Sequence, residues 1–200
     1  VLHRNNVDGK GASWGTHENY MMLRSVPFDT VAALMTAHFV SRQIYAGSGR
    51  VGIGERSETA GYQLSQRADY IHAILGLQTT FERPIVNTRD ESHSPSDYRR
   101  LHVIVGDANR MDVPQTLKLG ATSMLLWLAE HADETGYDLA ALLDSMALVD
   151  PVSAMHTVSH DLTLQAELPL RDGGVTNAWI MQVRLRAAVY EMGALVYGTD

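Results

Sequence analysis

The sequence contains no cysteine, and this absence excludes disulfides, thiol catalysis and zinc sites built from cysteine. It fits a reducing compartment, so we expect a cytoplasmic protein. No apolar run reaches the length of about 18 residues that a membrane-spanning helix needs, and we expect no membrane partner. Basic residues are few: 16 Lys and Arg stand against 23 Asp and Glu, for a net charge of −7. Because a general nucleic-acid-binding surface is basic, we expect no nucleic-acid partner.

The nine histidines include no H-E-x-x-H pattern, so a helical zinc protease is not supported. His131, His156 and His160 have no paired ligand nearby in sequence, which favours solvated or hydrogen-bonded core histidines. His17 and His102 differ because each lies at or within a short strand-like run beside a glycine-rich or charged segment. From the residues alone, either could bind a cation or face solvent from a strand.

The 200 residues, 45% hydrophobic and 20% charged, are typical of one soluble domain with a core. Hydrophobic periodicity and turn residues predict an α+β fold. Helices are predicted over residues 29–45, 114–132, 137–146 and 180–196, strand-like runs over 61–71, 84–88 and 99–105, and a hairpin from 162–170 and 175–179.

Two glycine-rich stretches stand out. In residues 9–15, three glycines and an alanine precede His17 and Glu18. Small side chains let the backbone approach a bound group closely, although an ordinary turn into a strand is the alternative. Residues 47–52 match G-x-G-x-x-G, but that nucleotide-binding fingerprint needs a preceding strand. A helical pattern precedes it here, which favours a loop that ends a helix.

Arginines are concentrated in residues 87–102, which also carry several acids and two histidines. The planar guanidinium matches phosphate and carboxylate oxygens, so an anion site and a surface salt-bridge loop are both open. Arg67 lies within QLSQRADY (63–70), and its predicted burial there would be costly unless the charge has a partner.

Five segments, in the same order, resemble the family of Pup ligases and Pup deamidases/depupylases. They are NNVDGKGASWGTHENYMM (5–22), VSRQIYAGSGRVGIG (40–54), GYQLSQRADYI (61–71), IVNTRDESH (85–93) and YRRLHVIVGDAN with LKLGAT (98–109 and 117–122). The resemblance implies a glutamine synthetase-like fold, in which a curved β-sheet cradle backed by helices holds ATP and Mg²⁺. Thr16, Ser48 and the GAS and GDAN segments are similar to the deamidase/depupylase branch, where the ligases have other residues.

The resemblance also implies roles for four residues. His17 and His102 are expected to bind the metal that accompanies the nucleotide. Arg67 and Arg89 are expected beside the phosphates and the reacting carboxyl centre, as catalytic and cofactor-binding residues. Because Mg²⁺ prefers oxygen, carboxylates and phosphates must complete its shell. The implied reaction removes ammonia from the C-terminal glutamine of Pup, and Pup from lysines of pupylated proteins, with ATP as a bound cofactor.

Two segments of the family are missing: a strand with two metal-binding glutamates, and a segment with the nucleophilic aspartate. We therefore expect a central fragment of the catalytic domain, with sheet and site core in 1–132 and a helix, hairpin and helix in 133–200. The N-terminal strands and the C-terminal domain are expected outside it, and the fragment alone is expected to be inactive. A Pup–protein ligase and a non-catalytic relative or fragment remain as alternatives.

Overall fold

The computed structural model describes residues 5–8, 12–51, 61–90 and 95–198. Its elements, in chain order, are β1 (Glu18–Leu23), α1 (Phe28–Ser41), α2 (Gln43–Ala46), β2 (Arg50–Val51), β3 (Tyr62–Gln63), the 3-10 helix η1 (Ala68–Tyr70), β4 (Ile71–Gly76), β5 (Arg83–Asn87), β6 (Tyr98–Val103), α3 (Asp112–Thr135), α4 (Leu139–Asp144), α5 (Pro151–His160), β7 (Leu168–Pro169), β8 (Val175–Thr176) and α6 (Ala178–Tyr197). Helices and strands are both well represented, so the predicted α+β class is confirmed.

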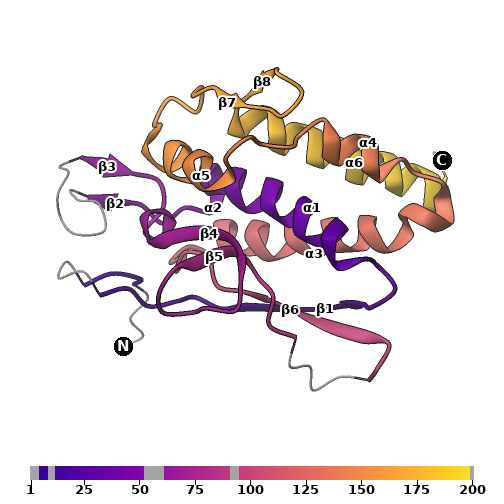
Figure 1. Ribbon diagram of the computed structural model, residues 1–200, viewed down its shortest axis with the longest axis horizontal. Helices are drawn as coiled ribbons and strands as arrows, with labels where there is room; N and C mark the ends of the chain where they lie inside the picture. Colours follow the sequence, from indigo (N-terminus) through magenta and orange to yellow (C-terminus); the bar gives the residue numbers. More distant parts are fainter. Residues whose placement is uncertain (1–4, 9–11, 52–60, 91–94, 199–200) are drawn as a thin grey trace.

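Helix α1 forms the centre of the core. It packs against α3, α5 and α6 and, on the side of the strands, against β5 (Figure 1). Val31, Leu34, Met35 and Phe39 are at most 1% exposed, and a helix with buried residues on this many sides is expected at the centre of a domain. Helix α3 packs against β1. The helices therefore form a layer that supports the strands from one side.

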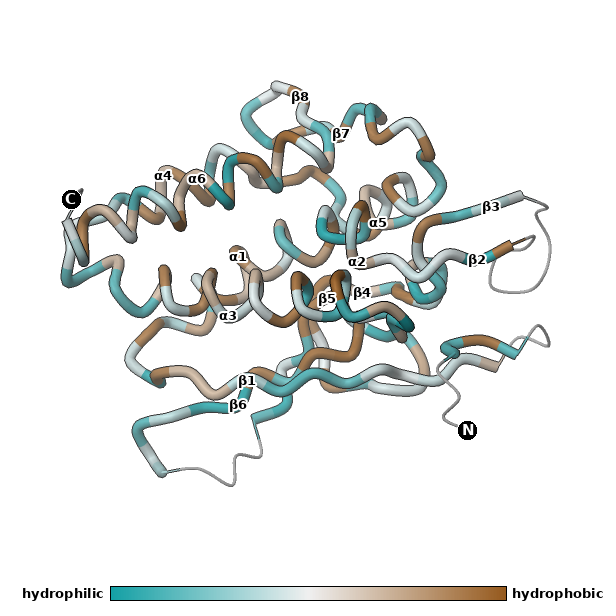
Figure 2. Tube along the Cα trace, turned by 180° about the vertical axis from the view of Figure 1, so that it is seen from behind, coloured by the Kyte–Doolittle hydropathy of each residue, from teal (hydrophilic) through white to brown (hydrophobic). Residues whose placement is uncertain are grey.

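Strands β1 and β6 form an antiparallel pair whose register matters for the site. Asn19 lies opposite His102, and Glu18 lies opposite Val103. Along β1, buried and exposed residues alternate, as a strand with one face on the core requires. Within the described residues the strands pair two by two: β1 with β6, β2 with β3, β4 with β5 and β7 with β8. Strand β5 also packs beside β6. The polar first half of β6 is coloured teal in Figure 2.

Most predicted elements are confirmed with small shifts in their ends. The first predicted helix is divided at Arg42 into α1 and α2, and the hairpin is confirmed with strands of two residues each. Helix α5 was not predicted. It begins with Pro151 after the capping residue Asp150, whose carboxylate accepts hydrogen bonds from the N–H groups of Val152 and Ser153. No helix among the described residues is long and apolar enough to span a membrane.

The strand-like prediction for residues 61–71 was largely wrong. Only Tyr62–Gln63 is extended there, and the next strand begins at Ile71. Between them, the hydroxyl of Ser65 accepts hydrogen bonds from the N–H groups of Arg67 and Ala68 (3.0 and 3.1 Å). Such local side-chain bonds compete with a strand ladder and here begin the 3-10 turn.

Candidate nucleotide and metal site

His17 and His102, 85 positions apart in the sequence, lie side by side. His17 immediately precedes β1, and the β1–β6 register brings His102 opposite Asn19, close to the start of that strand. The two ring centroids are 4.8 Å apart and the ring planes are nearly perpendicular, at 89°. His102 is buried, whereas His17 is exposed. The structure therefore brings together both histidines of the predicted metal site.

Gly15 lies against the His17 ring. A Cβ atom added at residue 15 would be 2.4 Å from Nε2 of His17 and 2.6 Å from its Cδ2. No side chain fits in that space without displacing the imidazole. The sequence predicted a close approach of the backbone to a bound group; what the structure shows at this glycine is a close approach to the imidazole two residues later.

Arg67 lies close enough to His17 for its charge to act on the imidazole, and it is almost completely buried, with 1% exposure. Its Nη1 donates to Oγ of Ser13 (2.7 Å), and its Nη2 donates to the carbonyl oxygen of Ile104 (3.0 Å). Its buried Nε has no hydrogen-bond partner among the described residues. Burial, with a smaller effect from the charge of Arg83, lowers the pKa of Arg67 to about 10. The guanidinium therefore remains charged at neutral pH.

The environment of His17 keeps its imidazole neutral. Partial burial, and then the positive charge of Arg67, lower the pKa of His17 below its usual value of 6.5. A metal ion binds only the neutral imidazole, because the ring must supply a lone pair. At neutral pH His17 is consequently in the state that a metal ligand requires.

Two further arginines lie against Tyr70, in the neighbourhood of Arg67. The guanidinium carbons of Arg50 and Arg83 lie 5.5 and 5.6 Å from the ring centroid of Tyr70. With Arg67, they concentrate positive charge in a chain that is acidic overall. Sequence reasoning missed both, although Arg50 lies inside the G-x-G-x-x-G stretch. Like charges gathered in this way favour a bound polyanion.

Arg89 lies in the exposed segment after β5, and its backbone N–H donates to Oδ1 of Asn87 (2.9 Å). The ring contact joins His17 to His102, and the charge interaction joins Arg67 to His17. Arg89 takes part in neither of these two contacts. Nearby, Asp90 forms an exposed ion pair with Arg24 at 2.5 Å. Arg24 lies outside the arginine-rich stretch, so this pair leaves both interpretations of the arginines in residues 87–102 as predictions.

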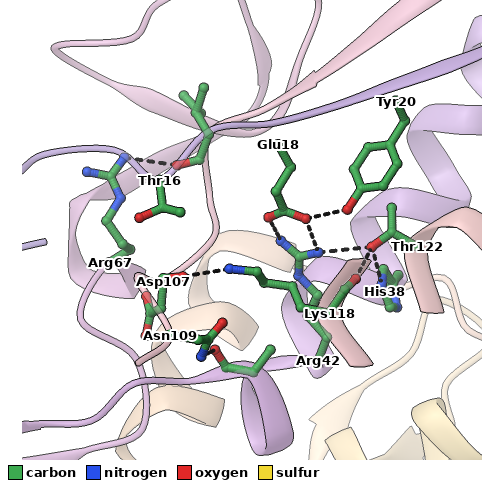
Figure 3. Close-up of polar contacts among 12 residues, drawn as sticks. Thr16, Glu18, Tyr20, His38, Arg42, Arg67, Asp107, Asn109, Lys118 and Thr122 are labelled. Carbon is green, nitrogen blue, oxygen red and sulfur yellow. Dashed lines mark hydrogen bonds and ion pairs between the residues drawn. The ribbon is translucent and has the colours of Figure 1, made fainter. Parts of the chain in front are cut away.

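A buried ion pair, which sequence reasoning missed, supports β1 beside the site (Figure 3). The guanidinium of Arg42 donates to both carboxylate oxygens of Glu18, at 2.6 and 3.0 Å, and also to Oγ1 of Thr122 (3.0 Å). The Tyr20 hydroxyl donates to Glu18 as well (2.5 Å). Burial and the charge of Glu18 raise the pKa of Tyr20, so the phenol stays protonated. These bonds fix Glu18, the residue that follows His17.

Asp107 connects the glycine-rich turn to the segment that carries Arg67. Its carboxylate accepts hydrogen bonds from the N–H groups of Ser48 and Gln66 and from the Ser65 hydroxyl, at 2.8 to 2.9 Å. Lys118 is fully buried, and its Nζ donates to the carbonyl oxygen of Asp107 (2.7 Å). Burial raises the pKa of the Asp107 carboxyl.

The three histidines that were predicted to be solvated or hydrogen-bonded in the core each form a hydrogen bond away from the His17–His102 pair. His131 contacts the carbonyl oxygen of Trp127, His156 that of Ile71, and His160 the carboxylate of Asp69, at 2.9, 2.9 and 3.0 Å. Within the described ranges, no group of three or more His, Cys, Asp or Glu residues could hold a metal ion. The His17–His102 pair is therefore at most a partial ligand set.

The residues present nevertheless fit a metal–nucleotide complex. Two imidazoles, one of them held neutral, supply nitrogen donors, and Arg67 has a buried N–H that no described residue accepts. A metal ion and a guanidinium repel each other unless an anion lies between them. Nucleotide phosphates would provide that anion and the oxygen ligands that Mg²⁺ prefers.

Comparison with known proteins identifies the family. The family model described as Pup-ligase protein matches residues 1–199. The Pup deamidase/depupylase of Mycolicibacterium smegmatis is 53% identical over 182 residues, which are 90% of this chain and 35% of that protein. The Pup–protein ligase of Kocuria rhizophila is 40% identical over 198 residues, covering 94% of this chain and 40% of the ligase. The chain thus spans well under half the length of these relatives.

The solved structure of the Pup ligase PafA in complex with ADP has a TM-score of 0.77 and 35% identity, covering 95% of this chain and 40% of the ligase. The match over residues 1–199 places this chain in the Pup-ligase protein family. It has the glutamine synthetase-like fold of that family. Relatives on both branches, depupylases and ligases, are similar to it.

Proposed function

We propose that this chain is the central part of a Pup deamidase/depupylase. The observation that carries the proposal is the convergence of His17, His102 and Arg67 in a chain 53% identical to a Pup deamidase/depupylase and 40% identical to a Pup–protein ligase. The complete protein would hydrolyse the C-terminal glutamine amide of Pup and release Pup from lysines of pupylated proteins. We propose that the reaction takes place in the cytoplasm. The absence of cysteine fits this reducing compartment, where proteins are not stabilised by disulfides.

ATP and Mg²⁺ are the proposed cofactors. His17 and His102 would contact the metal, and Arg67 would contact the phosphates with its unpaired Nε. Arg83 and Arg50 lie close enough to add to this positive field. When bound, the metal ion would supply electrostatic stabilisation of negative charge at the reacting carbonyl, and the nucleotide phosphates would hold it in place. The oxygen ligands and the nucleophile would come from the rest of the protein, so the fragment alone is proposed to be inactive.

The two proposed hydrolyses are the same chemical step. Water, or an enzyme nucleophile later replaced by water, adds to the γ-carbonyl carbon, and the C–N bond breaks. The nitrogen leaves as ammonia from glutamine or as the lysine amine from a conjugate. Arg67, charged at neutral pH, would stabilise the oxyanion, and the family resemblance gives Arg89 the same role. One site can therefore serve both substrates.

A comparison of two forms of Pup tests the proposed branch. The complete protein is incubated with ATP and Mg²⁺, and with Pup that ends in glutamine or in glutamate. Conversion of the glutamine form to glutamate, read by mass spectrometry, is the expected result. Conjugation of the glutamate form to protein lysines, without deamidation, would instead assign the chain to the ligases. Inactivity in both assays would favour a non-catalytic relative.

A further inference from the structure

Asn19 contacts His102, and the family comparison assigns no role to Asn19. It lies directly opposite His102 in the β1–β6 register, and its Oδ1 is 2.9 Å from Nδ1 of the His102 ring. Arg100 is two residues before His102 on β6, so both side chains emerge on the same face of the strand. Nη1 of Arg100 donates to the same Oδ1 at 3.3 Å. The amide oxygen of Asn19 is therefore within hydrogen-bonding distance of two nitrogen atoms, one from His102 and one from Arg100.

The chemistry of these groups fixes where the His102 proton lies. A guanidinium can only donate, so the Asn19 atom that faces Arg100 is the carbonyl oxygen and not the amide nitrogen. A carbonyl oxygen can only accept, so the ring nitrogen beside it must carry a hydrogen. His102 is thereby held with its proton on Nδ1. The neutral ring then has its lone pair on Nε2.

We propose that Asn19 and Arg100 are positioning residues: Arg100 orients the Asn19 amide, and the amide oxygen fixes His102 as the tautomer whose Nε2 can bind a metal ion. The inference rests on the proposed function, in which His102 contacts the metal. Ring nitrogens that bind metals are commonly oriented by a hydrogen bond from the opposite nitrogen to a carbonyl or carboxylate oxygen. Here the acceptor is a side chain on the strand that follows His17, so the same strand would orient both histidines.

Nuclear magnetic resonance of the complete protein, with ¹⁵N-labelled histidine and no metal, tests the inference at alkaline pH where imidazoles are neutral. The His102 signal is assigned by its loss in His102→Gln. We expect the proton on Nδ1 in the wild type and in Asn19→Asp, which keeps an acceptor oxygen. In Asn19→Leu the acceptor is lost, and in Arg100→Met the amide can rotate, so the Nε2–H tautomer should become populated in both.

Arg99→Met is the matched control, since Arg99 is on the same strand but donates to the carbonyl oxygen of Arg24 (3.1 Å). It should leave the His102 tautomer unchanged. A wild-type proton on Nε2, or an unchanged tautomer in both Asn19→Leu and Arg100→Met, would overturn the inference. If Asn19→Leu does not fold, Arg100→Met against Arg99→Met still decides the result.

Binding of Mn²⁺ in the presence of ADP, followed by electron paramagnetic resonance, separates this inference from the proposed function. Asn19→Leu should weaken Mn²⁺ binding about 10- to 100-fold, the usual effect of losing a group that orients a ligand, and Asn19→Asp should restore it. A shifted tautomer with unchanged Mn²⁺ affinity would support the positioning of the His102 proton. The same result would refute His102 as a metal ligand.

Discussion

Replacing Arg42 by methionine should strongly destabilise the protein, because it leaves the buried carboxylate of Glu18 without its cation. Arg42 and Glu18 have side chains only 3% and 2% exposed. The substitution removes two charge-assisted bonds to Glu18 and one to Thr122, and it leaves the Tyr20 hydroxyl as the remaining donor in this group. Removing one partner of a buried ion pair costs about 3–5 kcal/mol, and we expect a loss in this range.

The assay is urea unfolding of the complete protein, with Arg24→Met as the matched control. Arg24 also pairs with a carboxylate, that of Asp90, but the two side chains are 41% and 37% exposed, and such pairs contribute less than about 1 kcal/mol. The double variant Glu18→Gln/Arg42→Met should lose less than Arg42→Met alone, because no unpaired charge remains. If Arg42→Met costs no more than Arg24→Met, the reasoning about the buried pair is refuted.

Three further predictions concern the site and its support. Gly15→Ala should displace the His17 imidazole and lower deamidation to the level of His17→Ala. The free energy of unfolding in urea should change by less than about 1 kcal/mol. Wild-type deamidation by Gly15→Ala would contradict the contact between Gly15 and His17. Burial and the charge of a nearby arginine hold the pKa of His38 well below 6.5, so the unfolded chain binds the extra proton and stability should fall by about 1.4 kcal/mol per pH unit below pH 6.5. His38→Gln should remove that slope in unfolding measured at several pH values, and an unchanged slope would contradict the buried neutral histidine. Gly47→Ala would place Cβ 2.3 Å from a backbone carbonyl oxygen and should cost about 2 kcal/mol or more, whereas Gly120→Ala, in an open helical position, should stabilise by about 0.5–1 kcal/mol in the same thermal or urea assay.

Local patterns predicted most helices because helical periodicity is contained in a short window of sequence. The same reasoning missed α5, although the Asp150–Pro151 pair is a helix-start signal. It misassigned residues 61–71, where the Ser65 hydroxyl binds nearby backbone N–H groups and turns the chain. That choice depends on where a single side chain points, which hydrophobic periodicity does not encode.

The site was predicted through family resemblance, not through spacing. His17 and His102 meet only because β1 pairs with β6 in one register, and strand pairing between distant segments is not visible in local sequence. The buried ion pair was missed for the same reason. Glu18 and Arg42 lie in separate segments of the sequence, and their contact depends on how the junction between α1 and α2 is placed relative to β1.

The most direct test of the central claim measures deamidation of glutamine-ended Pup by mass spectrometry, with the complete protein, ATP and Mg²⁺. Wild type is compared with His17→Ala and His102→Ala, and with His160→Ala as a control, because His160, the last residue of α5, binds Asp69 of η1. The account predicts conversion by the wild type and the control, and a loss in the two site variants at least as large as the roughly 10- to 100-fold effect of losing a group that only orients a ligand. Wild-type rates in His17→Ala and His102→Ala would contradict the assignment of this cluster as the nucleotide and metal site.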